Sequence, residues 1–176
     1  AYMFALGLPM LGLLVGSLVA VRLEGHPLTW RELMARFRYK RMSWADWGWT
    51  AVVFAAEMAV YTLFSTVTIS FINRGWTPLP GNLPAFVDPR TVFTTETLDT
   101  AVGGLAGNWP ILFLSLLLLL INVVGEEFWW RGYVLPRQEQ AFGANTWWIH
   151  GLLWTVFHAY KYWDLFSLLP LSLGLA

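Results

Sequence analysis

The sequence contains no cysteine among its 176 residues. A disulfide framework, a thiolate metal site and a cysteine nucleophile are therefore excluded for these residues. Charge is also scarce, because 12% of the residues are charged whereas soluble domains carry about a quarter. The formal net charge is zero, so the total charge indicates no acidic or nucleic-acid partner, and no nucleic acid is expected. Neither HExxH, GxSxG, a phosphate-binding glycine loop nor a dinucleotide fingerprint occurs.

Apolar residues take the place of charge. Hydrophobic residues make up 57% of the chain, and it contains 12 tryptophans. This composition predicts an integral membrane protein of the all-α class, a polytopic transmembrane helical bundle of about five membrane helices with amphipathic surface helices. We expect residues 1–176 to form a single membrane-embedded domain. Because the chain begins with Ala1 and stops inside an apolar run, we also expect it to be truncated.

The predicted membrane helices follow the apolar runs. They cover residues 2–21, 47–72, 109–135 and 146–163, and Asp164 is predicted to cap a fifth helix. Glu57 is the only charged residue inside the second of them. Its carboxyl either faces the bundle interior, protonated or hydrogen-bonded, or has a direct role in function, and the first interpretation is favoured.

The connecting loops set the predicted orientation. Residues 22–46 hold six of the eleven lysines and arginines, which places this loop in the cytoplasm and residues 73–108 on the other side. Within the cytoplasmic loop, Leu28, Leu33, Met34 and Phe37 recur at near-helical spacing. This pattern predicts a short amphipathic helix on the membrane surface. The expected location is a bacterial plasma membrane, crossed several times.

Two adjacent acids, Glu126 and Glu127, directly follow the third apolar run, and Arg131 comes four residues after Glu127. Carboxylates at membrane depth are costly and commonly mark function. Glu127 and Arg131 have the favoured spacing for a helical ion pair, which either is purely structural or supports a site. Glu126 points about 100° away around an α-helix, so we assign it to a partner on the next helix.

That partner is predicted to be His158. If the chain forms an antiparallel hairpin that turns at residues 142–143, Glu126 and His158 lie equally far from the turn and face each other. A carboxylate and an imidazole so placed can hold one water and activate it. The alternative for His158 is a core histidine bonded to a carbonyl. His150 would lie about 12 Å from His158, too far to share a metal ion, so neither a metal nor another cofactor is expected.

These residues form two motifs. Glu126, Glu127 and Arg131 make up EExxxR, and Trp154 and His158 make up an aromatic-xxx-His pair on the next helix. The combination resembles the CAAX protease and bacteriocin-processing family, also called CPBP or Abi proteins. The resemblance implies an all-helical, metal-independent intramembrane glutamic endopeptidase in which Glu126 and His158 activate water. Glu127 and Arg131 would support the site, and Trp154 replaces the family's phenylalanine.

Three interpretations of function remain at this point. As an endopeptidase, the protein would cut a peptide or protein substrate near the cytoplasmic leaflet. As a non-catalytic relative, it would serve as a scaffold among the subunits of a membrane complex; the family's third motif, HxxxN or HxxxD, does not occur in this sequence. In the third interpretation, Glu126 and His158 relay protons in a transporter or channel fragment. In each of them, membrane lipid is a further partner.

Overall fold

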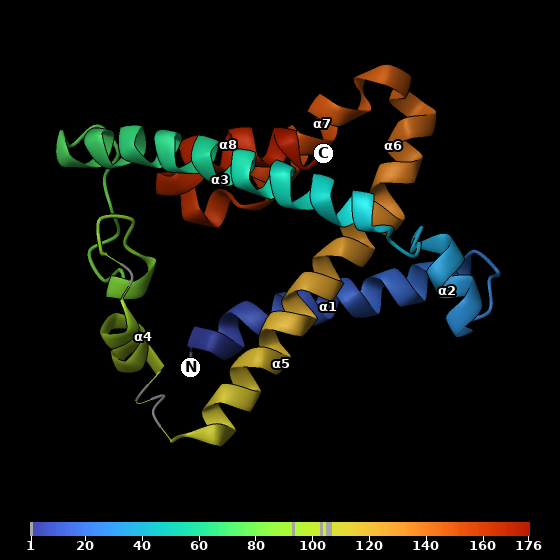
Figure 1. Ribbon diagram of the computed structural model, residues 1–176, viewed down its shortest axis with the longest axis horizontal. Coiled ribbons are helices and arrows are strands. Elements are labelled where there is room, and N and C mark those ends of the chain that lie inside the picture. Colours follow the sequence, from blue (N-terminus) through green and yellow to red (C-terminus); the bar gives the residue numbers. More distant parts are fainter. Residues whose placement is uncertain (1, 93, 103, 105–106) are drawn as a thin grey trace. The chain divides into compact units, whose positions relative to one another are not determined.

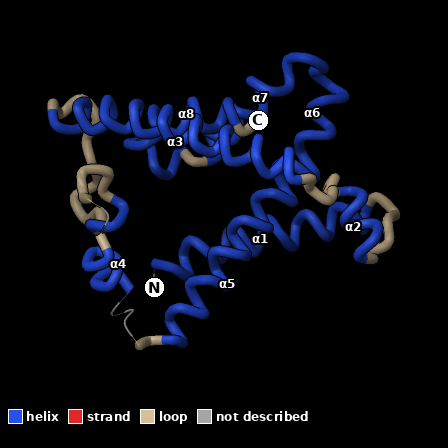
Figure 2. Tube along the Cα trace, in the orientation of Figure 1, coloured by secondary structure: helices blue, strands red, loops and turns tan. Residues whose placement is uncertain are grey.

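The computed structural model describes residues 2–92, 94–102, 104 and 107–176, and these residues form helices and connecting turns with no strand (Figures 1 and 2). The α-helices are α1 (Tyr2–Leu23), α2 (Trp30–Arg36), α3 (Trp44–Asn73), α4 (Thr95–Val102), α5 (Trp109–Glu126), α6 (Leu135–Phe142), α7 (Thr146–Phe157) and α8 (Leu165–Gly174). The shorter or wider helical segments are η1 (Ala85–Val87), η2 (Glu127–Val134), η3 (Gly143–Asn145) and η4 (Ala159–Asp164). The predicted all-α class is confirmed.

The chain divides into two compact units. The first unit combines residues 1–41 with 108–146, and the second combines residues 42–107 with 147–176. Each unit is described by itself below. The single domain expected over residues 1–176 stays a prediction.

In the first unit, α1 packs along α5 and reaches η2 (Figure 1). Glycines allow the two helices to approach closely. A Cβ atom on Gly125 would collide with the carbonyl group of Met10, and one on Gly7 would lie 2.7 Å from a methyl group of Leu118. Gly125 directly precedes Glu126, so the closest approach of α1 lies beside the first acid of the motif.

Helix α2 belongs to the same packing. Thr29 caps its first turn by accepting a hydrogen bond from the backbone N–H of Glu32. The predicted amphipathic helix is therefore present, and part of its apolar face packs against the protein. Leu28 of that face is 48% exposed, and the placement of the helix on the membrane surface stays a prediction. Phe37 is buried with Val21 and Phe128, and Leu33 and Met34 pack against this cluster. The periodicity predicts the helix correctly, and three of its apolar residues contact protein rather than lipid.

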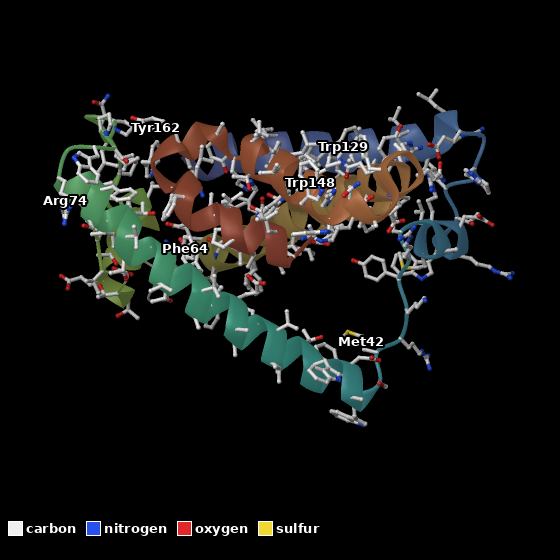
Figure 3. All side chains as sticks on the ribbon, turned by 90° about the horizontal axis from the view of Figure 1, so that it is seen from above. Met42, Phe64, Arg74, Trp129, Trp148 and Tyr162 are labelled. Carbon is white, nitrogen blue, oxygen red and sulfur yellow. The ribbon has the colours of Figure 1, made fainter. Side chains whose placement is uncertain are left out.

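In the second unit, α3 and α8 lie side by side (Figure 1). Thr68 and Ser167, both almost fully buried, share a hydrogen bond of 2.7 Å between the two helices. The Phe166 ring packs between Phe64 and Phe71, with centroid distances of 5.1 and 5.6 Å. Most other side chains of α3 project outward along its length (Figure 3). Apolar side chains exposed in this way suit a helix surrounded by lipid.

Two helical runs in the described residues are long and apolar enough to cross a membrane, Trp44–Asn73 and Trp109–Phe157. A shorter apolar helical stretch covers Gly7–Leu23. These helices support the prediction of a membrane protein. The number of about five spans, and the cytoplasmic and non-cytoplasmic sides assigned to loops 22–46 and 73–108, stay predictions.

Candidate active site

The first motif lies where an α-helix widens into a π-helix. Helix α5 begins with Asn108 as its cap and ends at Glu126, and the π-helix η2 begins at Glu127. The helical run then continues as α6 through Pro136 to Phe142, so the helix end predicted at residue 135 is wrong. A proline ring clashes with the carbonyl four residues earlier in an α-helix. A wider turn just before Pro136 relieves that clash, which accounts for the π-helix there.

The predicted ion pair between Glu127 and Arg131 is present. A guanidinium nitrogen of Arg131 donates to the Glu127 carboxylate at 2.6 Å. The Glu127 side chain is 39% exposed and the Arg131 side chain is 27% exposed, so water screens part of the attraction. The ion pair joins two side chains of η2, which begins one residue after Glu126.

A strap made of residues 24–39 covers η2 and α6 within the first unit. The Phe37 ring stacks on Phe128 with a centroid distance of 4.0 Å and an interplanar angle of 23°. Phe37 also occupies the space where a Cβ atom on Gly132 would stand. Gly132 follows Arg131 directly, so the strap packs against the helix that carries the whole first motif.

Ion pairs fasten the strap at both ends. Arg38 donates two hydrogen bonds to the carboxylate of Glu139 on α6, at 2.6 and 3.0 Å. Glu24 pairs with Arg36 at 2.7 Å and also with Arg137 of α6. Arg38 adopts φ of +58°, and the following turn ends α2 with the two hydrogen bonds of a Schellman motif. An arginine in this glycine-favouring conformation costs free energy that its bidentate ion pair helps to offset.

The second motif lies at the end of α7. The α-helix stops at Phe157, short of the predicted end at residue 163, and the chain continues into the 3₁₀ turn η4. His158 marks the transition, because its N–H donates to the Thr155 carbonyl and its own carbonyl accepts from the N–H of Lys161. The imidazole of His158 is therefore presented from a helix terminus.

Aromatic rings and one hydrogen bond fix this imidazole, which is 8% exposed. Trp154 and Phe157 lie edge-on to it, with centroid distances of 4.4 and 5.2 Å. Nδ1 of His158 lies 2.9 Å from the Trp154 carbonyl oxygen. Because a carbonyl can only accept, Nδ1 carries the hydrogen, and Nε2 of the neutral ring keeps a lone pair. The carbonyl-bonded core histidine considered above and a histidine oriented for chemistry both have this geometry.

The turn that follows His158 is anchored to α3. Asp164 occupies the position before α8, as predicted, although its side chain makes no capping bond to that helix. Instead the carboxyl interacts with Ser167 and with Tyr61 of α3. Together with the bond between Thr68 and Ser167, these contacts fix η4, and hence the point from which His158 leaves α7.

The residues of the two motifs belong to different units. Glu126, Glu127 and Arg131 are part of the first unit, and Trp154 and His158 are part of the second. The predicted meeting of Glu126 with His158 around one water stays a prediction. In the described residues no group of three or more His, Asp or Glu side chains is placed to hold a metal ion.

Two residues that support the first motif were missed in the sequence. Gly125 permits the close approach of α1, and Phe37 fills the space over Gly132. The signal for Gly125 was present as a glycine at the end of a long apolar run. The sequence places Phe37 on the apolar face of the predicted surface helix, and nothing in its local spacing distinguishes lipid from η2 as the partner.

One comparison with known proteins gave a match. Residues 108–176 match the family model described as Type II CAAX prenyl endopeptidase Rce1-like. No curated protein and no solved structure gave a match. The matched residues include both motifs, from Glu126 to His158. The predicted resemblance to the CAAX protease family is thereby confirmed over residues 108–176, which are similar to that family's model, and the apolar helices support a membrane protein.

Proposed function

We propose that the protein is a glutamate-type intramembrane endopeptidase with Glu126 and His158 as its catalytic residues. The observation that carries this proposal is the family match, which spans both motifs in one stretch of chain. The fixed tautomer of His158 supports it, because the ring keeps one nitrogen available as an acceptor. The protein would act as a multi-pass protein of a bacterial plasma membrane.

The proposed chemistry is hydrolysis without a metal ion. Glu126 removes a proton from a water molecule that Nε2 of His158 orients, and the water oxygen attacks the carbonyl carbon of the peptide bond. The proton held by Glu126 then passes to the leaving amine as the carbon–nitrogen bond breaks. The substrate is a peptide or protein segment near the cytoplasmic leaflet, where the first motif is predicted to lie.

Three further residues support this arrangement in the proposal. The ion pair between Glu127 and Arg131 fixes the start of η2, so that Glu126 stays at the end of α5. Trp154 contributes the carbonyl that fixes the His158 tautomer and the ring that restricts its rotation. Loss of either contact should reduce turnover less than loss of Glu126 or His158.

Peptidase assays on the full-length protein in liposomes test the proposal. Glu126→Gln and His158→Ala should each lower kcat by a factor of about 100 or more, as expected for removal of a general acid or base. His158→Asn keeps a polar side chain and guards against a loss caused by misfolding. Glu96→Gln, on an exposed residue of α4, serves as the matched control and should leave turnover unchanged.

Unchanged turnover in both Glu126→Gln and His158→Ala would refute the assignment. No turnover in the wild-type protein against any membrane peptide would favour the alternative, a non-catalytic relative that acts as a scaffold subunit in a membrane complex. In that case, the same substitutions should change assembly of the complex rather than any hydrolysis.

A further inference from the structure

Charge is unevenly divided between the two units. The first unit holds eight of the eleven lysines and arginines and five of the eleven acids, so it carries a formal net charge of +3. The second unit holds three basic and six acidic residues, a net charge of −3. The neutral total charge is therefore the sum of a basic first unit and an acidic second unit.

Ion pairs within the first unit account for half of its basic residues. Arg36 and Arg137 both pair with Glu24, Arg38 pairs with Glu139, and Arg131 pairs with Glu127. The other four basic residues are exposed, and the described part of the chain offers them no ion pair. They are Arg22, Arg31, Lys40 and Arg41, which we call the basic face.

The four cations lie within the strap or within two residues of it in the sequence. Arg22 lies in the last turn of α1, two residues before Glu24, and Glu24 joins that end to α2. Lys40 and Arg41 directly follow the segment that Arg38 ties to α6. Nitrogen-tipped side chains project from α2 and from the stretch that leads to Met42 (Figure 3). Because Phe37 is packed inward, the outward side of the strap is the charged one.

Two exposed aromatic side chains lie next to the basic face in sequence. Trp30 is 75% exposed and precedes Arg31, and Tyr39 is 53% exposed and precedes Lys40. Tryptophan and tyrosine beside lysine and arginine are typical of the headgroup level of a bilayer. In the sequence, residues 24–43 connect the apolar helix α1 to the apolar helix α3, so the basic face is tethered to both helices by the chain.

We propose that the basic face binds the headgroups of anionic phospholipids. Each Lys or Arg near an anionic membrane surface strengthens binding by about 1 kcal/mol, which is about a fivefold change in the binding constant. Arg22, Arg31, Lys40 and Arg41 act together, while Trp30 and Tyr39 set the depth. An acidic protein would satisfy the same charges, but the position in the sequence between two apolar helices favours lipid. This inference is independent of the proposed peptidase activity.

The absence of cysteine makes a direct test straightforward. Leu28→Cys, on an exposed side chain of the strap, receives a fluorescent label, and the protein is placed in phosphatidylcholine vesicles that contain a minor fraction of phosphatidylglycerol. In one sample the phosphatidylglycerol carries an acyl-chain spin label, and in a second sample the phosphatidylcholine carries the same label. The ratio of fluorescence quenching in the two samples measures how strongly phosphatidylglycerol is enriched beside the fluorescent label. A second label at Trp76→Cys, after the other end of α3, provides the matched control position.

Phosphatidylglycerol should quench the label at position 28 several-fold more than phosphatidylcholine, and this preference should fall in high salt because salt screens exposed charges. The triple variant Arg31→Gln, Lys40→Gln and Arg41→Gln should lose most of the preference, whereas Arg74→Gln should retain it. A preference that survives in the triple variant, or that is equally strong at position 76, would overturn the proposal. Capture of an acidic protein without any lipid preference would overturn it as well.

Discussion

Phe37 packs over Gly132, so substitutions at these two positions should have coupled effects on the free energy of unfolding. The Phe37 side chain is 7% exposed, and it fills the space in which an alanine methyl group at position 132 would stand. Truncation by Phe37→Ala removes the stack on Phe128 and leaves a cavity. Gly132→Ala instead forces the ring out of its site.

The expected magnitudes follow from these contacts. Phe37→Ala should lower the free energy of unfolding by about 3 kcal/mol, at the lower end of the usual range for a buried phenylalanine because α2 is short and exposed. Gly132→Ala should cost about 1–2 kcal/mol, since overpacking outweighs the gain of about 1 kcal/mol in helix propensity. In the Phe37→Ala background the clash is gone, so Gly132→Ala should become neutral or stabilising. The predicted coupling is about 2 kcal/mol.

The free energy of unfolding can be measured for all four proteins in detergent micelles titrated with SDS, with helical circular dichroism as the signal. Tryptic cleavage at Arg31, which lies within α2, reports opening of the strap independently. If Gly132→Ala lowers the free energy of unfolding equally in the wild-type protein and in the Phe37→Ala variant, the packing of Phe37 on η2 is refuted. Glycine 12 has open space around it, so Gly12→Ala provides a control that should show no coupling.

Two further contacts give predictions. Thr68→Val removes the buried hydrogen bond to Ser167 and should lower the free energy of unfolding by about 1 kcal/mol, measured by the same SDS titration, and Ser167→Ala in that background should cost less than it does alone. Hydrogen bonds from Arg90 lower the pKa of Asp88, so the turn they form should keep its full stability above the usual carboxyl range and lose it as pH falls through the lowered pKa. Amide exchange at residues 88–91 should therefore accelerate only in strongly acidic solution, and Arg90→Gln should move that acceleration to higher pH.

Features that depend on neighbours along the chain were predictable from the sequence. Asn108 and Pro110 begin α5 where the apolar run starts, because a capping side chain and a proline both suit a first helical turn. The ion pair between Glu127 and Arg131 follows from its spacing of four residues, and so does the contact of Trp154 with His158. Each of these involves atoms within about one turn of helix.

Features that depend on distant parts of the chain were not predictable. Apolar spacing in α2 is the same whether its apolar face meets lipid or protein, so the inward position of Phe37 could not be read from it. Pro136 indicated a break, yet a helix widened to a π-helix can pass through proline when the surrounding packing holds it. His158 was expected inside a helix, whereas contacts of Asp164 with α3 hold the turn that ends it.

The central claim is that Glu126 and His158 meet at one water, and a thiol cross-linking measurement tests it most directly. Residues 1–176 contain no cysteine, so Glu126→Cys and His158→Cys can be introduced together as the reactive pair in this chain in membranes and treated with a short bifunctional thiol reagent. Glu127→Cys with His158→Cys is the matched control, since Glu127 faces its partner Arg131 on η2. The account predicts efficient cross-linking of positions 126 and 158 and little of 127 and 158. No cross-link from position 126, or equal cross-linking in both pairs, would contradict it.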